Sequence, residues 1–197
     1  MTTDAAPSTV RRLDMPAAVE LAGLTAAFDD LQYVLRCCEH LVEALGSGGE
    51  PDTVMVEALW TGALVGYVRC FSPRAAVLSE ADLAELKLDG DIQQFHDMLK
   101  TLRDHLASRH VNPREAFTVG AAQANDGRPT GIAVVSSPRP LVDQATVRML
   151  GGVAYSLAGV LDDRMQDCQR RVLGDAAELT PTELARLPLV HLSSGPS

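Results

Sequence analysis

Two histidines and an arginine recur at intervals of seven residues in one segment: His96, Arg103 and His110. An α-helix drifts by only about 20° over seven residues, so the three side chains lie along one edge of the helix that we predict here. The apolar residues of this segment recur three and four positions apart, which is the pattern of a buried stripe. They are Ile92, Phe95, Leu99, Leu102 and Leu106. The segment therefore predicts an amphipathic helix with imidazole and guanidinium groups beside its buried stripe.

These polar side chains suit the chemistry of phosphate esters. A histidine can take the proton from a 2′-hydroxyl of RNA, or give one to the leaving oxygen, because its pKa lies near neutrality. An arginine can stabilise the charge that develops on the phosphoryl oxygens. We therefore assign His110 as acid or base and Arg103 as the phosphate-binding group, with Asp104 orienting a neighbour and His96 contributing. The alternative is that all four are polar residues flanking the stripe of an ordinary amphipathic helix.

The elements around this helix are predicted to be mainly α-helical. Apolar periodicity and capping signals indicate helices over 14–45, 52–71, 80–87, 91–109 and 141–174, and a short helix after Thr180. Between them, Asn125-Asp126-Gly127 separates two β-prone runs and predicts a β-hairpin over about 116–137. The expected fold is a helical bundle of four to five helices over 14–175 with this one inserted hairpin. Residues 1–13 form a flexible N-terminal tail, and 176–197 form the short helix and a flexible C-terminal tail.

The helix predicted over 52–71 is apolar nearly all round, which is typical of a central buried helix. Arg69 lies near its end, and an arginine in a buried helix needs an acidic partner. We expect that partner to be an acid such as Asp97 or Asp104.

Composition limits the classes of function. The formal net charge is −9, which argues against a broadly basic nucleic-acid-binding surface. The N-terminus lacks the apolar core of a signal peptide, and the most apolar run is too short to span a bilayer. We therefore expect a cytoplasmic protein that does not enter the membrane.

Metal and cofactor chemistry find little support in the sequence. The four cysteines lack paired metal-ligand spacing, and reduced thiols are the simplest interpretation. Alternative metal ligands are His105 with Asp104 or His96, and the upstream acids Glu80, Asp82 and Glu85. A solvated acidic face explains these acids better, so we expect no metal site and no cofactor.

The segments that carry the arginines and histidines resemble the HEPN superfamily. The resemblance rests on Ala58-Leu59-Trp60, Tyr67-Val68-Arg69-Cys70-Phe71, Phe95-His96, Leu102-Arg103-Asp104 and His110-Val111-Asn112. It implies a small, dimeric helical bundle in which an Arg, a polar neighbour and a later His from two protomers form one metal-independent ribonuclease site. Arg103-Asp104 and His110 match this motif, whereas an alternative register places Arg109 where the family has its histidine.

Two functions are therefore expected. The first is a HEPN-like, metal-independent endoribonuclease of a defence or toxin-type system, acting on RNA as a homodimer. The second is a catalytically inactive helical interaction module that dimerises and binds a protein partner. Arg103 and His110 in an open groove would favour the enzyme, whereas salt-bridged side chains on a flat surface would favour the module.

Overall fold

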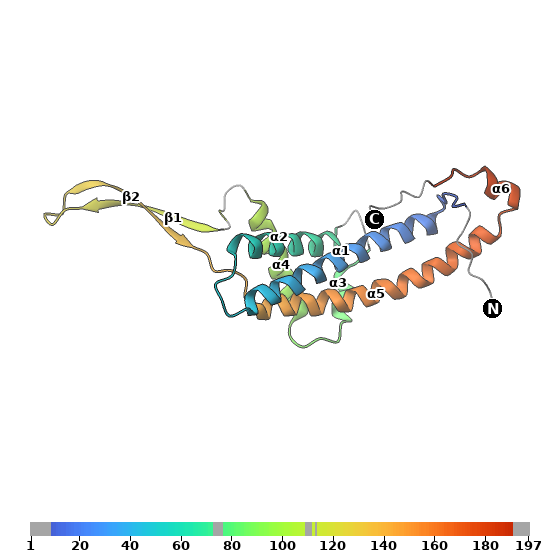
Figure 1. Ribbon diagram of the computed structural model, residues 1–197, viewed down its shortest axis with the longest axis horizontal. Coiled ribbons are helices and arrows are strands. Elements are labelled where there is room, and N and C mark those ends of the chain that lie inside the picture. Colours follow the sequence, from blue (N-terminus) through green and yellow to red (C-terminus); the bar gives the residue numbers. More distant parts are fainter. Residues whose placement is uncertain (1–8, 73–76, 109–111, 113, 191–197) are drawn as a thin grey trace. The chain divides into compact units, whose positions relative to one another are not determined.

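The computed structural model describes residues 9–72, 77–108, 112 and 114–190. Within them the chain forms six helices and one antiparallel hairpin (Figure 1). The elements are α1 (Pro16–Gly46), α2 (Thr53–Arg69), α3 (Glu80–Ala84), α4 (Ile92–Ala107), β1 (Glu115–Gln123), β2 (Pro129–Pro138), α5 (Gln144–Ala177) and α6 (Pro181–Arg186). The mainly α-helical fold with an inserted hairpin is confirmed, and the two short helices, α3 and α6, begin where their capping signals predicted them.

The chain divides into two compact units. One comprises residues 29–158, and the other comprises residues 1–28 together with 159–197. The long helices α1 and α5 each contribute residues to both. Among the described residues, no helix combines the length and the hydropathy that crossing a membrane requires.

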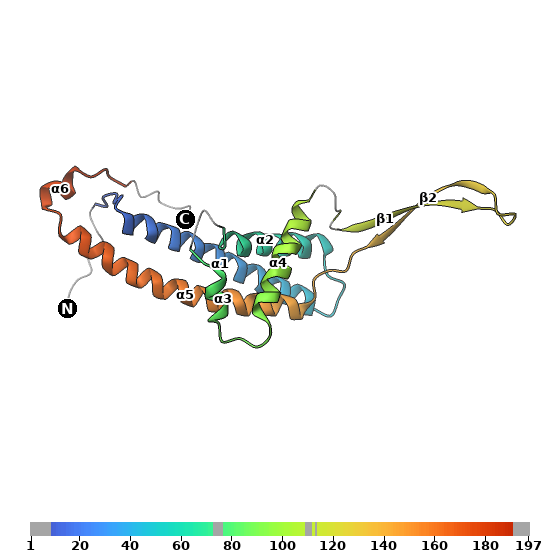
Figure 2. The ribbon, with the colours of Figure 1, turned by 180° about the vertical axis from the view of Figure 1, so that it is seen from behind.

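The larger unit has its core between α1, α2, α4 and α5. Fully buried leucines and aliphatic side chains dominate it, because each helix turns one apolar stripe inward. They include Leu31, Val34, Leu41, Leu64, Leu99, Leu150, Val153 and Leu157. Helix α4 crosses α2, and α3 packs against α4 (Figure 2).

Helix α2 is less buried than its composition predicts. Val54 is 74% exposed and Val65 is 46% exposed, while Leu64 and Tyr67 are completely covered. The prediction of a central buried helix is therefore wrong for one face of α2. When a helix is hydrophobic nearly all round, its sequence does not show which face the neighbouring helices cover.

The smaller unit joins the first turns of α1 to the last turns of α5. Cys168 donates its thiol proton to the carbonyl of Ala17, with 3.2 Å between sulfur and oxygen. Arg171 forms an ion pair with Glu20 at 2.7 Å. This pair lowers the pKa of the Glu20 carboxyl and raises that of the Arg171 guanidinium.

Two terminal segments that were expected to be flexible pair with each other in this unit. Arg12 N donates to the carbonyl of Pro188 at 2.8 Å, and Val190 N donates to that of Val10 at 2.9 Å. The side chain of Arg11 donates to the carbonyl of Leu187 at 2.8 Å. This backbone pairing could not be predicted from the sequence, because the paired segments lie at opposite ends of the chain and local composition does not record such contacts. The remaining residues of the predicted tails, 1–8 and 191–197, lie outside the described part of the chain.

The two strands of the hairpin pair with each other and lie almost entirely exposed. Its turn contains Gly127 at φ +83°, the left-handed region that glycine adopts without strain. The strands pair in register with Phe117 opposite Ser136, Val119 opposite Val134 and Ala121 opposite Ile132. Apart from Glu115, every strand residue is exposed.

Candidate functional site

Helix α4 carries most of the predicted site residues. Its N-cap is Asp91, whose carboxylate accepts the backbone N–H of Gln94 at 2.9 Å. Along the predicted stripe, Ile92, Phe95 and Leu99 are buried, and the stripe becomes half-buried toward the end of the helix. This orientation places the edge with His96 and Arg103 against α2 and α3.

His96 lies inside the protein rather than on an accessible edge. Only 1% of its surface is exposed, and its Nδ1 is 3.0 Å from the hydroxyl of Tyr67. The imidazole ring also contacts the rings of Tyr67 and Phe71, with centroids 5.7 and 4.5 Å away. Burial and the nearby Lys100 ammonium lower the pKa of His96, so its imidazole is neutral near pH 7. The Tyr67 partner had no signal in the sequence.

Arg103 forms an ion pair with its neighbour in the chain, Asp104. Arg103 Nε lies 2.8 Å from Asp104 Oδ1, but the two groups are not oriented for a hydrogen bond. The buried Nε–H therefore has no hydrogen-bond partner among the described residues. The Arg103 side chain is 38% exposed. Its ion pair with Asp104 reduces the positive charge that it can offer to a ligand.

His110, the predicted acid or base, lies outside the described residues, as does Arg109. The prediction for His110 therefore stays a prediction. Of the four predicted catalytic residues, the structure brings His96 and Arg103 to the wall of one cavity and joins Asp104 to Arg103.

Arg69 has an acidic partner, as predicted, but the partner is Asp30 and neither Asp97 nor Asp104. Its guanidinium binds the carboxylate of Asp30 on α1 through two nitrogens, with Nε donating to Oδ2 at 2.7 Å. The Arg69 side chain is 65% exposed, so the premise of a buried arginine was wrong as well. Asp30 lies 39 positions earlier in the chain, and helix packing alone brings it to Arg69.

A cavity of about 480 Å³ lies where α2, α3 and α4 meet. Its described lining comprises Val65, Val68, Arg69, Phe71, Ser72, Leu78, Ser79, Glu80, His96, Lys100 and Arg103. The Lys100 ammonium is 3.6 Å from Glu80 Oε1 and 3.8 Å from Asp97 Oδ1. All three cations of the lining are thus paired with carboxylates. Glu80, His96 and Asp97 also bring one ligand atom each within 4.8 Å of the others, a spacing that a metal ion could use.

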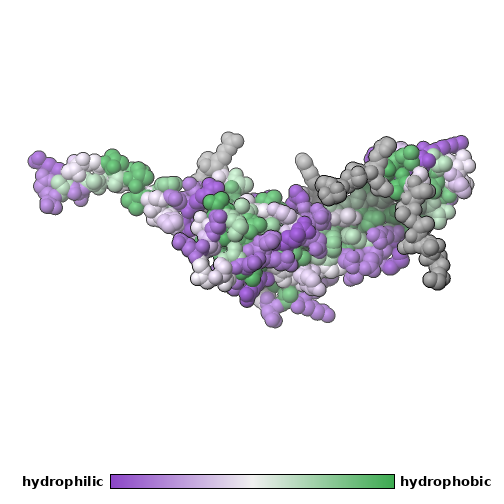
Figure 3. Space-filling view, in the orientation of Figure 1, coloured by the Kyte–Doolittle hydropathy of each residue, from purple (hydrophilic) through white to green (hydrophobic). Residues whose placement is uncertain are grey.

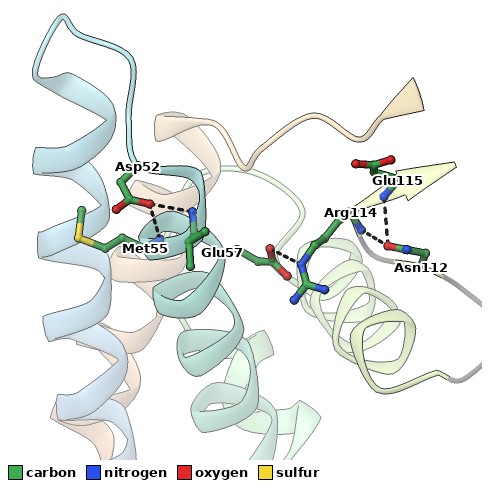
Figure 4. Close-up of polar contacts among 7 residues, drawn as sticks. Asp52, Met55, Glu57, Asn112, Arg114 and Glu115 are labelled. Atoms are coloured by element: carbon green, nitrogen blue, oxygen red, sulfur yellow. Dashed lines mark hydrogen bonds and ion pairs between the residues drawn. The ribbon is translucent and has the colours of Figure 1, made fainter. Parts of the chain in front are cut away.

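A second hollow, of about 530 Å³, lies at the base of the hairpin. Arg114, just before β1, donates through Nε to Glu57 of α2 at 2.8 Å (Figure 4). Asn112 accepts the backbone N–H groups of Arg114 and Glu115 on its side-chain oxygen, at 2.8 and 3.2 Å. The pair of Arg114 and Glu57 ties the start of the hairpin to α2, and sequence reasoning missed it because the two residues lie 57 positions apart. The Asn112 contacts are local and shape the turn that leads into β1.

The two faces of the hairpin differ in side-chain size. Alternate residues of paired strands share a face, so the register places Phe117, Val119, Ala121, Ile132 and Val134 together. The opposite face carries small residues: Ala116, Thr118, Gly120, Ala122, Gly131, Ala133 and Ser137, with Val135 the largest. The first set, which we call the large face, is exposed in Phe117 (56%), Val119 (68%), Ile132 (74%) and Val134 (65%). Figure 3 shows hydrophobic residues along the strands and hydrophilic ones at the turn.

Comparison with known proteins gave no match: no family model fits the sequence, and no curated protein or solved structure is significantly similar to the chain. The resemblance to the HEPN superfamily therefore rests on the quoted residues alone.

Proposed function

We propose that this protein is a helical interaction module that dimerises through the large face of its hairpin and binds a protein partner as a dimer. The observation that carries the proposal is the exposure of Phe117, Val119, Ile132 and Val134 on one face. An isolated two-stranded hairpin is marginally stable in water, and contiguous exposed apolar side chains mark interaction surfaces.

Charge favours a second copy of the chain as the occupant of this face. From Ala116 to Ser137 the only formal charges are Asp126 and Arg128, which lie in the turn and cancel. The whole chain carries −9, so two copies repel over most of their surfaces. The neutral hairpin is a surface at which they can approach, and a twofold axis would pair each large face with its identical counterpart.

Dimerisation would cover apolar surface on both copies of the chain. Each of the four large side chains contributes about 1–2 kcal/mol when its exposed part is covered. The same four side chains contribute from each copy, so the large face is the part of the described surface where self-association gains most from burial.

Sedimentation velocity between about 1 and 200 μM tests this proposal. We expect wild-type protein to form dimers and Val119→Lys/Ile132→Lys to be monomeric with an unchanged far-UV spectrum. Thr118→Lys/Ala133→Lys is the matched control, because it adds the same charges to the small face. The control should still dimerise. A monomeric wild type, or equal behaviour of the two variants, would overturn the proposal.

The second candidate function is metal-independent RNA cleavage by a HEPN-like site. The observation that favours it is that Arg103 shares a cavity with Arg69 and Lys100, which are groups that suit phosphate. Incubation of an RNA pool in EDTA tests it: wild type should leave 2′,3′-cyclic phosphate ends, and Arg103→Ala/His110→Ala should not. Arg148→Ala, the loss of an exposed charge on α5, is the control. Intact RNA with folded wild-type protein would exclude this function.

A further inference from the structure

We propose that Glu80, His96 and Asp97 form a binding site for a first-row divalent metal ion, with Zn²⁺ as the reference ion. The site lies on the wall of the cavity between α2, α3 and α4, and it goes beyond the dimerisation proposed above. One ligand atom of each residue lies within 4.8 Å of the other two. Atoms bound to one ion at about 2.0–2.2 Å lie within roughly 4.4 Å of each other, so small rotations of the two exposed carboxylates complete the site.

The imidazole of His96 is held in place as a metal-binding histidine usually is. Its Nδ1 is 3.0 Å from the Tyr67 hydroxyl, and the rings of Tyr67 and Phe71 pack against it. When Nδ1–H donates a hydrogen bond to the Tyr67 hydroxyl, the free lone pair of the imidazole is on Nε2. A hydrogen bond of this kind orients a metal-binding histidine and selects its tautomer. His96 is 1% exposed and lines the cavity, and its Nε2 makes no hydrogen bond with a described residue.

The position of Lys100 shows that positive charge is favourable at this place. Its ammonium bridges Glu80 and Asp97 at 3.6 and 3.8 Å, longer than the 2.7–2.9 Å of a tight charge-assisted hydrogen bond. The Lys100 side chain is 41% exposed and can turn into solvent. With Lys100 in place the two carboxylates keep one uncompensated negative charge, whereas a divalent ion neutralises both. Lys100 is therefore a competitor of the metal ion.

The donor set selects the class of ion. Ca²⁺ and Mg²⁺ prefer sites made of oxygen atoms alone, whereas an imidazole with carboxylates suits Zn²⁺ and its first-row neighbours. Three protein ligands leave a coordination position for water or another ligand, as in zinc sites that are not purely structural.

Calorimetric titration of metal-free, full-length protein with ZnCl₂ tests the proposal. We expect saturable binding of one ion below about 100 μM. Lys100→Met should bind about tenfold more tightly, because the competing ammonium is gone. Glu80→Gln/Asp97→Asn should bind at least tenfold more weakly. Glu178→Gln/Asp89→Asn, which makes the same two exchanges at exposed acids outside the site, is the matched control and should bind like wild type.

The role of His96 is tested without replacing a buried side chain. In long-range ¹H–¹⁵N spectra, Zn²⁺ should move the Nε2 resonance of His96 in wild type and leave it in place in Glu80→Gln/Asp97→Asn. The proposal is overturned if Zn²⁺ does not saturate a site below 1 mM. It is equally overturned if Lys100→Met binds no more tightly than wild type, or if the control weakens binding as much as the ligand variant does.

Discussion

The buried contact between Tyr67 and His96 yields a quantitative prediction about stability. Tyr67 is completely buried, His96 is 1% exposed, and the hydroxyl and Nδ1 are 3.0 Å apart. Tyr67→Phe removes the hydroxyl and leaves a buried imidazole nitrogen without its partner. A buried polar atom left unsatisfied costs about 1–3 kcal/mol, so the variant should lose that much free energy of unfolding. For a chain of this size each kcal/mol shifts the Tm by about 2–4 °C.

A double-mutant cycle isolates the contact from the changes in packing. We expect Tyr67→Phe/His96→Leu to be less destabilised than the sum of its two single variants, because neither polar group is then stranded. The coupling free energy should be about 0.5–3 kcal/mol. Urea unfolding followed by far-UV circular dichroism, with EDTA present, measures all four proteins.

The reasoning is refuted if the two single changes are additive within about 0.5 kcal/mol, or if Tyr67→Phe costs less than that. Tyr155→Phe serves as the control, because Tyr155 is 74% exposed and should change the free energy of unfolding by less than about 0.5 kcal/mol.

Three further predictions follow from burial and charge. The free energy of unfolding should fall below about pH 6.5, by at most about 1.4 kcal/mol per pH unit, because the pKa of His96 is lowered in the folded protein and the unfolded chain therefore binds the proton first. Urea midpoints measured from pH 7.5 to 5.5 should show this slope, and the His96→Leu variant should show a flatter one. Leu157→Ala should cost about 2–5 kcal/mol in the same assay, whereas Leu173→Ala, 72% exposed on the same helix, should stay within about 0.5 kcal/mol. Asp30→Asn removes the ion pair with the exposed Arg69 and should cost only about 0–1 kcal/mol, with the loss shrinking in 1 M NaCl.

Local sequence signals predicted the elements of this fold well. The three-and-four spacing of Ile92, Phe95 and Leu99 predicted α4, and these residues are buried. Asn125-Asp126-Gly127 predicted the hairpin, and Gly127 has the positive φ that such turns require. These features could be inferred because backbone preference and apolar periodicity act over a few residues.

The environment of the site residues could not be inferred in the same way. The spacing of His96 and Arg103 placed them on one helix edge, but only the crossing of α2 over α4 buried His96 beneath Tyr67. The same packing gave Arg69 a partner on α1 instead of on α4. Partners 29 and 39 positions apart leave no periodic trace in the sequence, since their proximity depends on how helices pack.

The hairpin shows most clearly what the sequence determines and what tertiary packing decides. Alternation within each strand determined that Phe117 shares a face with Val119, and Ile132 with Val134, because successive strand residues point to opposite sides. The pairing register of the two strands then placed both pairs on the same face. Only the tertiary structure decided that the helices leave this face exposed. The sequence by itself therefore determined the helices, the hairpin and the alternation along each strand. Tertiary packing decided which faces were covered, because burial depends on neighbours that lie far away in the chain.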